Sequence, residues 1–316
     1  MPLFVKKSAE STEYEPVAGI VDLKIIYERY RSAAEQFKAL PDQEISDGGS
    51  LNVVQKEVAF LLPDDSNVKR VGSDAATTCH IFIARAKSAP QVTALAHFDD
   101  GNIEEYVESV VKELKTEYPA STDYSCHLFG GFNDDRGISR NLSECVLDEL
   151  VKNSDKYKLN FYLEAGCITD LNNVVKNGQN WPRIYGVICD VKTGSINPAK
   201  FTVPAPAAPV RHLYSIFGPP NLNHIYSTRH GFIEIKPFVY DSPYYIRQTL
   251  SMDLDVIRQH FSTSPLVEPE NFASDLRAAF KFCYENPDPQ KTVFVNKKPL
   301  RFAYKNDGDS ASWFQL

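Results

Sequence analysis

The sequence predicts an α+β fold built on mainly antiparallel sheets. Strand-like and helix-like segments alternate irregularly along the 316 residues, and several strand pairs are joined by short turns. A doubly wound fold would instead alternate strands and helices regularly around a parallel sheet. No internal repeat is found, so one domain spanning 1–316 is expected. The Pro-rich stretch at 204–220 is interpreted as a surface connection within it, and the alternative is a domain boundary.

The first part of the chain begins with an amphipathic helix over 21–40, because its apolar residues recur at helical spacing. These residues are Ile26, Tyr30, Ala33, Phe37 and Leu40. Residues 51–62 follow as a strand. Two more strands, 79–86 and 92–98, form a hairpin whose turn contains Ser88 and Pro90.

The next part begins with a helix over 103–116, where two acidic side chains in the first turn favour the helix dipole. Its apolar stripe consists of Ile103, Tyr106, Val107, Val110 and Leu114. The elements predicted after it are a strand at 124–132, a helix at 139–152, strands at 158–168 and 184–191 with a turn at 192–195, a helix near 270–285 and a strand pair across 292–304.

Composition excludes several classes of protein. The net charge is -7, the pI is near 5.6, and no run of Lys or Arg exceeds two residues, so a general nucleic-acid binder is not expected. The first residues lack the apolar stretch of a secretory signal, and no segment has the ~20 apolar residues that span a bilayer. A cytoplasmic location, extending to the nucleus, and a monomeric state are expected.

The six cysteines, Cys79, Cys126, Cys145, Cys167, Cys189 and Cys283, include no CxxC pair. A zinc ribbon or thioredoxin-like site is therefore not indicated. Free thiols are expected in a reducing compartment. Most free cysteines are small buried hydrophobic residues, so a catalytic cysteine has to be identified by its neighbours.

Cys79 has such a neighbour in His97, one hairpin later. The register that pairs these two residues leaves a five-residue loop at 86–90 and places both side chains on one face, with opposed Cβ atoms about 4.5–5.5 Å apart. The other pairs of this register are Ile81 with Leu95, Ile83 with Thr93 and Arg85 with Gln91. A slip of one residue would separate the two side chains.

The pair suits nucleophilic catalysis, because an imidazole can deprotonate a thiol and later protonate a leaving amine. Ser73, at the turn before the strand, is placed to orient the imidazole through its second nitrogen. This chemistry requires no metal and no organic cofactor. The structural alternatives are an inert core thiol at Cys79, a hydrogen-bonded strand end at His97 and an ordinary turn residue at Ser73.

Five motifs together carry a resemblance to a known family. They are GSDAATTCH (72–80), HFDDG (97–101), GGFNDDRG (130–137), IYG (184–186) and STSPLVEPENF (262–272), and the opening MPL agrees with them. In their order and spacing, the chain resembles the protein N-terminal asparagine amidohydrolases over nearly its whole length.

The resemblance implies hydrolysis of the side-chain amide of an asparagine at a protein N-terminus. The aspartate formed would be extended by an arginyltransferase, which marks the protein for degradation. The family's nucleophile, histidine and hydroxyl partner fall on Cys79, His97 and Ser73. The spacing is also similar to bacterial chemoreceptor glutamine deamidases and cytotoxic necrotizing factor toxins, which implies their α-β-β sandwich with two sheets.

Substrate selection requires a group that senses a free α-ammonium, and a partly buried carboxylate can do this. Glu268 is the candidate, and the resemblance supports it; the alternative is an exposed residue before a helix that begins near Pro269. Pro2 is the second candidate for substrate binding, or else an ordinary chain end. Deamidation of internal glutamine or asparagine, and a non-catalytic binding module, remain the alternative functions.

Overall fold

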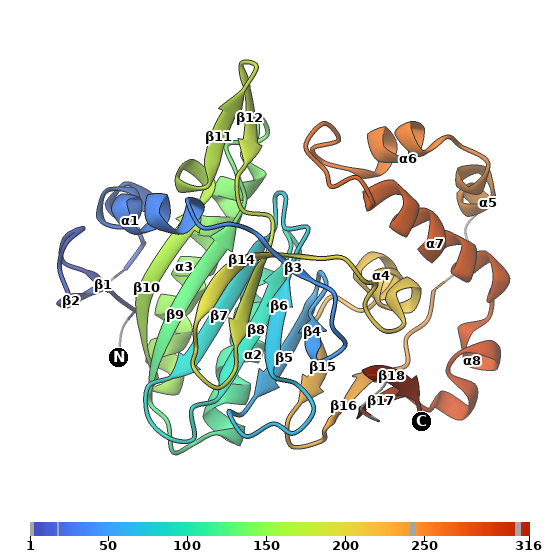
Figure 1. Cartoon of the computed structure of the whole chain (residues 1–316), viewed down its shortest axis with the longest axis horizontal. Coiled ribbons are helices and arrows are strands. Elements are labelled where there is room, and N and C mark those ends of the chain that lie inside the picture. The colour runs from blue at the N-terminus through green and yellow to red at the C-terminus, as the bar shows by residue number, and fades with distance from the viewer. Residues whose placement is uncertain (1–2, 18, 241–243, 307–310) are drawn as a thin grey trace.

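The computed structural model describes residues 3–17, 19–240, 244–306 and 311–316 (Figure 1). It has a mixed α and β architecture with several sheets and helices, as the sequence predicts. Its largest sheet has 11 strands in the order β18-β17-β16-β15-β5-β8-β7-β9-β10-β1-β2. These strands are β18 (Ala311–Gln315), β17 (Leu300–Asn306), β16 (Phe232–Ile235), β15 (Asn223–Ser227), β5 (Glu57–Leu61), β8 (Thr93–Phe98), β7 (His80–Ala86), β9 (Asp123–Gly130), β10 (Asn160–Ile168), β1 (Leu3–Lys6) and β2 (Tyr14–Val17).

The centre of this sheet is antiparallel, because β8 runs against both β5 and β7, and β7 runs against β9. Parallel pairs lie further out, where β10 joins β9 and β1, and β15 joins β5. All seven residues of β7 and all six of β8 are buried. The β7–β8 hairpin, which was predicted to hold the site, therefore lies in the interior of the sheet.

A second sheet has five strands in the order β3-β14-β13-β6-β4. They are β3 (Gln43–Ile45), β14 (Ile196–Phe201), β13 (Val187–Asp190), β6 (Arg70–Ser73) and β4 (Ser50–Asn52). A separate hairpin is formed by β11 (Asn173–Lys176) and β12 (Gln179–Pro182).

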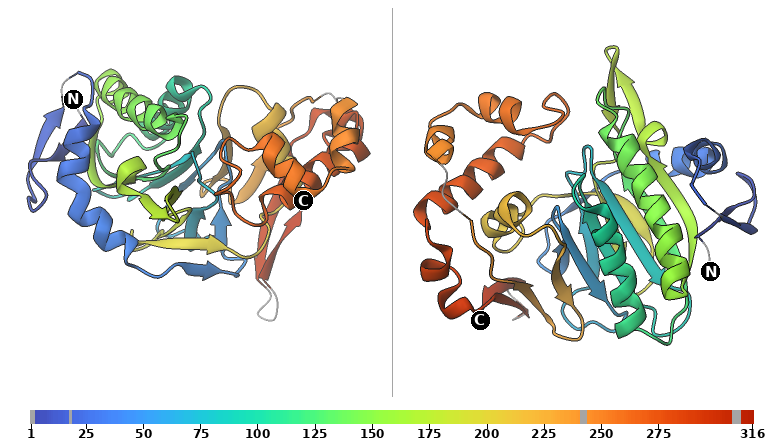
Figure 2. Two further views of the ribbon diagram at one scale, coloured as in Figure 1. Left: turned by 90° about the horizontal axis from the view of Figure 1, so that it is seen from above. Right: turned by 180° about the vertical axis from the view of Figure 1, so that it is seen from behind.

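Helices α2 (Ile103–Glu117) and α3 (Ile138–Tyr157) lie on one face of the large sheet, and the five-stranded sheet lies on the other (Figure 2). The whole apolar stripe predicted for α2 is buried. That burial explains the helix, since packing of an amphipathic face supplies most helical stability in proteins. Helix α1 (Leu23–Lys38) packs beside β10.

The C-terminal helices form a group beside the sheets, with α4 in gold and the later helices in orange and red in Figure 1. Helix α7 packs against its neighbours α4, α5 and α6. The elements of this group are α4 (Ala208–Phe217), α5 (Tyr244–Leu250), α6 (Leu254–Phe261), α7 (Phe272–Glu285) and α8 (Pro289–Thr292). Short 3-10 turns occur at Thr169–Leu171 and Val295–Lys297. Within the described residues, no helix combines the length and apolar character that crossing a membrane requires.

Most predicted elements are confirmed within a few residues, and two are wrong. The predicted strand 51–62 is two strands in different sheets, β4 and β5, separated at Lys56, whose φ is 66°. The predicted strand pair across 292–304 is also wrong. The end of α8 and the 3-10 turn occupy the start of that range, and β17 pairs with β16 and β18, which both lie outside it.

Candidate active site

Cys79 lies at the end of the segment that joins β6 to β7. This segment is fixed at Ala76, whose N–H donates a hydrogen bond of 2.8 Å to the carbonyl of Tyr185. On its other side, β9 approaches so closely that a Cβ at Gly130 would lie 2.5 Å from the Cys79 carbonyl oxygen. Glycine, which also tolerates the φ of 104° found there, is required at this position. Cys79 itself is half-buried.

The hairpin register differs by two residues from the prediction. Ile81, not Cys79, lies opposite His97, and the other pairs shift equally, so Ile83 opposes Leu95 and Arg85 opposes Thr93. The five-residue loop begins one position later, because Ala86 still pairs with Val92 through an N–H···O bond of 2.9 Å. The predicted pairing of Cys79 with His97 is therefore wrong, because β7 begins at His80, which lies opposite Phe98, and Cys79 precedes the strand.

Ser73 and His97 form the clearest contact of the predicted site. The Ser73 Oγ lies 2.7 Å from His97 Nδ1, and both residues are buried, at 0% and 2% exposure. The hydrogen bond joins β6 of the second sheet to β8 of the large sheet. His97 Nε2 is buried and has no hydrogen-bond partner among the described residues. With the ring proton on Nδ1, facing Ser73, Nε2 is left as the proton acceptor.

The electrostatics favour neutral forms of both groups. Burial raises the pKa of the Cys79 thiol well above its ordinary value, and the carboxylates of Asp99, Glu268 and Asp100 add to the rise. Burial lowers the pKa of His97 to about 4. A thiolate–imidazolium pair is therefore disfavoured at neutral pH, and the neutral imidazole is in the form that a general base needs.

Asp99 belongs to this site and had no role in the sequence analysis. It is 9% exposed, and it acts electrostatically on both Cys79 and His97. Gln55 donates to its Oδ2 at 2.9 Å, and the Gly101 N–H donates to its Oδ1 at 3.0 Å. It directly follows the last residue of β8, and its presence with His97 in the HFDDG motif was the available signal.

Glu268 lies in the loop between α6 and α7, close to the segment that carries Cys79. Its Oε2 accepts a hydrogen bond of 2.8 Å from the Thr77 hydroxyl, and its Oε1 accepts one of 2.5 Å from Ser262. Glu268 is half-buried, and burial raises its pKa. The alternative of an exposed residue just before a helix is therefore wrong, and α7 begins only at Phe272.

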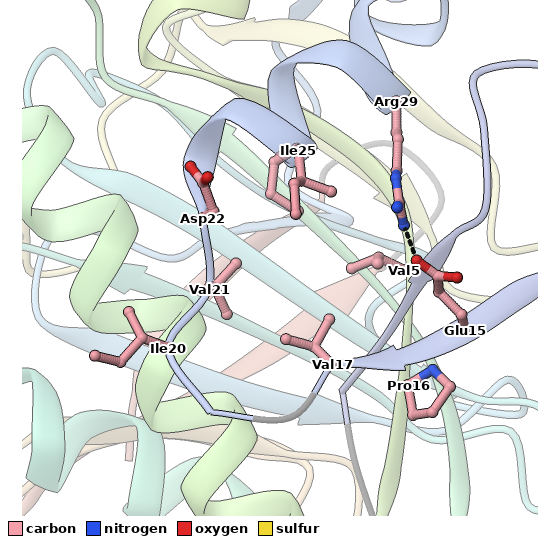
Figure 3. Close-up of a pocket in the computed structure, with 10 residues that line it drawn as sticks. Val5, Glu15, Pro16, Val17, Ile20, Val21, Asp22, Ile25 and Arg29 are labelled. Carbon is pink, nitrogen blue, oxygen red and sulfur yellow. Dashed lines mark ion pairs between the residues drawn. The ribbon is translucent and has the colours of Figure 1, made fainter.

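Pro2, the other predicted substrate-binding residue, falls outside the described residues. A cavity of about 180 Å³ lies between β1, β2 and α1 (Figure 3). Its lining is mixed: apolar side chains lie beside Asp22 and an ion pair of 2.6 Å between Arg29 and Glu15. It includes none of the predicted site residues among those described.

Comparisons with known proteins agree with the motifs. Residues 40–314 match the family model described as protein N-terminal asparagine amidohydrolase. The chain belongs to this family. Curated members named protein N-terminal asparagine amidohydrolase include those of Homo sapiens and Mus musculus, each 31% identical over 268 residues, which cover 84% of both chains. The Arabidopsis thaliana member is 25% identical over 307 residues, covering 87% of each.

The family match contains Ser73, Cys79, His97 and Glu268, whereas Pro2 precedes it. Among solved structures, YlmD from Geobacillus stearothermophilus is 14% identical, with a TM-score of 0.26, over 46% of this amidohydrolase chain and 71% of its own. A similarity at that level supports no inference about the fold.

Proposed function

We propose that this chain hydrolyses the side-chain amide of an asparagine at the N-terminus of a protein or peptide, releasing ammonia and leaving aspartate. The observation that carries the proposal is the cluster formed by Cys79, the Ser73–His97 pair and Glu268, in a chain that belongs to the amidohydrolase family. A thiol, a neutral base with an orienting partner and a carboxylate that can bind a cation are the groups this reaction needs.

The proposed reaction begins with proton transfer from the Cys79 thiol to His97 Nε2 as the sulfur attacks the amide carbon. The C–S bond forms, and the carbonyl π electrons move to oxygen to give a tetrahedral oxyanion. When that oxyanion collapses, the C–N bond breaks and His97 returns the proton to the departing ammonia. A thioester to Cys79 remains.

Water then completes the turnover with His97 again as base. His97 takes a proton from the water as the water oxygen attacks the thioester carbon. The C–S bond then breaks, His97 returns that proton to the leaving sulfur to restore the thiol, and the carboxylic acid formed loses its remaining proton to solvent to give the carboxylate. Ser73 contacts neither reactant; it orients the imidazole and stabilises the imidazolium that forms transiently. No step requires a metal or an organic cofactor.

Glu268 is proposed to bind the α-ammonium of the substrate. The hydrogen bonds from Thr77 and Ser262 favour its charged form and oppose the effect of burial. An internal asparagine has no such ammonium, so its binding would leave the carboxylate desolvated and unpaired, at a cost of about 1–3 kcal/mol or more. This cost distinguishes the proposed reaction from deamidation of internal residues.

The domain organisation, the oligomeric state, the cellular location and the role of Pro2 stay predictions. We propose one domain over 1–316, organised as a deamidase-type α-β-β sandwich. The large buried cluster that includes residues from Leu3 to Phe294 and the position of the large sheet between α2, α3 and the second sheet support this. A monomer in the cytoplasm or nucleus that supplies the N-degron pathway with N-terminal aspartate remains an expectation, as does a contact between Pro2 and the substrate.

The proposed function is tested by ammonia release from three peptides that differ only at the first residue, beginning with Asn, Gln and acetyl-Asn. We expect rapid release from the Asn peptide and at least 100-fold slower release from the other two. Comparable turnover of the acetylated peptide would favour a deamidase of internal residues. No release from any of the three would favour a binding module.

A further inference from the structure

Two residues join the segment that carries the nucleophile to the loop that carries Glu268. Thr77, two positions before Cys79, is 3% exposed, and its hydroxyl donates to Glu268 Oε2 at 2.8 Å across a separation of 191 residues. A buried hydroxyl held by a carboxylate is a charge-assisted contact, which is about twice as strong as a neutral hydrogen bond.

Tyr185 makes the second connection through two different atoms. Its carbonyl accepts the Ala76 N–H at 2.8 Å, and its hydroxyl donates to the carbonyl of Val267 at 2.9 Å. The residue therefore holds the backbone three positions before Cys79 and the backbone one position before Glu268. We refer to Thr77 and Tyr185 together as the bridge.

The far side of the Glu268 loop is also fixed. Arg258 of α6 donates to the carbonyl oxygens of Glu268 and Pro269 at 2.9 and 3.0 Å, and Ser262 holds the second oxygen of the carboxylate at 2.5 Å. Because both carboxylate oxygens and the backbone carbonyl of Glu268 are held, the distance of the carboxylate from Cys79 depends on the bridge and not on a free rotamer of Glu268.

That distance matters because of the length of the substrate side chain. Three bonds separate the α-nitrogen from the amide carbon in asparagine, and four separate them in glutamine. One methylene in an apolar pocket gives only about 10- to 200-fold discrimination. With the ammonium held at Glu268, however, the extra methylene moves the amide carbon away from the sulfur, and a misplacement of about 1 Å costs roughly 100-fold in rate.

We propose that Thr77 and Tyr185 are positioning residues that set the separation between Glu268 and Cys79, and that this separation selects asparagine over glutamine. The inference rests on the proposed function, because it takes Glu268 as the ammonium site. It assigns roles to the IYG motif and to the threonine two residues before the nucleophile.

The test compares Thr77→Val, which keeps the shape but removes the hydroxyl, with Tyr185→Phe and with the double variant. Thr77→Ser restores a hydroxyl, and Thr78→Val is the matched control. Thr78 is the adjacent residue and bonds Thr263 of the same loop at 3.3 Å, but it does not bond Glu268. Ammonia release from Asn and Gln peptides gives kcat and KM, and thermal unfolding shows which variants are folded.

We expect Thr77→Val to raise KM for the Asn peptide and to lower kcat/KM by about 10- to 100-fold. The ratio of kcat/KM for Asn over Gln should fall by at least 10-fold, further still in the double variant. Thr77→Ser and Thr78→Val should retain kcat/KM for the Asn peptide and the Asn-to-Gln ratio within about threefold.

Two results would overturn the inference. In the first, the ratio of kcat/KM for Asn over Gln in Thr77→Val and in the double variant equals that of the unaltered chain. This includes the case in which kcat/KM falls by the same factor on both peptides. In the second, Thr78→Val lowers this ratio as much as Thr77→Val does. Failure of the proposed function looks different, because the unaltered chain would then release no ammonia from the Asn peptide.

Discussion

The hydroxyl oxygen of Ser73 lies 2.7 Å from Nδ1 of His97, and this bond joins the second sheet to the large one. It fixes the imidazole in one orientation, and Nε2 is buried with no hydrogen-bond partner among the described residues. The mechanism proposed above uses Nε2 as the base, so it depends on this orientation.

Replacing Ser73 with Ala should therefore reduce kcat about 10- to 100-fold with little change in KM, because the imidazole loses its orienting partner. The matched control is Ser143→Ala, which removes a buried hydroxyl 2.5 Å from Nε2 of His80. It should affect stability but not kcat per folded molecule. The measurement is steady-state kinetics on the Asn peptide. An equal loss of kcat in both variants would contradict the role of Ser73 as the orienting partner of His97.

Replacing Glu268 with Gln should change two properties in opposite directions. The Glu268 carboxylate raises the pKa of Cys79, so a neutral side chain lowers that pKa and increases the thiolate fraction at a given pH. Alkylation of Cys79 by iodoacetamide at pH 8 should become faster, while turnover of the Asn peptide falls through a higher KM.

The alkylation rate is measured by peptide mass spectrometry, with the exposed Cys145 as an internal reference. Glu270→Gln, an exposed position in the same loop, is the control and should leave both rates unchanged. Slower alkylation of Cys79 in Glu268→Gln would show that the carboxylate does not act on the thiol as described.

The pH dependence of kcat/KM follows from the directions of two pKa shifts. Burial lowers the pKa of His97 to about 4, so the base is lost only as the pH falls through that value. Burial raises the pKa of Glu268 above its ordinary value of 4.5, so the ammonium site loses its charge first. The acidic limb for the Asn peptide should therefore be set by Glu268.

In the Glu268→Gln variant that titration is absent, and the acidic limb should move down towards pH 4. Rate profiles of both proteins between pH 4 and 8 test this. A limb centred near 6.5, the ordinary pKa of histidine, would mean that His97 is not buried as the structure has it. If the acidic limb does not move in Glu268→Gln, a group other than Glu268 sets it.

Local patterns in the sequence were sufficient for most of the fold. The α2 stripe and the β7–β8 hairpin are contiguous in the chain, so periodicity identifies them. The parallel pairing of β15 with β5, and the separation of 51–62 into two sheets at Lys56, depend on contacts between distant segments. The error over 292–304 has the same origin, because β17 pairs with a strand beyond that range.

Only part of the candidate site could be predicted from the sequence. The hairpin was predicted, but its register is shifted by two residues, so Ile81 lies opposite His97 and Cys79 precedes β7. Glu268 could be proposed as a carboxylate, but its bond to Thr77 spans 191 residues and no local pattern encodes it. Asp99 was passed over because its sequence neighbours suggest only a turn before α2, whereas its burial beside Cys79 is a tertiary property.

The most direct test of the account is ammonia release from an Asn-initiated peptide by the unaltered chain and by Cys79→Ala, each confirmed as folded by thermal unfolding. We predict steady release by the former and no release above background by the latter. Turnover by Cys79→Ala equal to that of the unaltered chain would contradict the assignment of the nucleophile and the mechanism built on it.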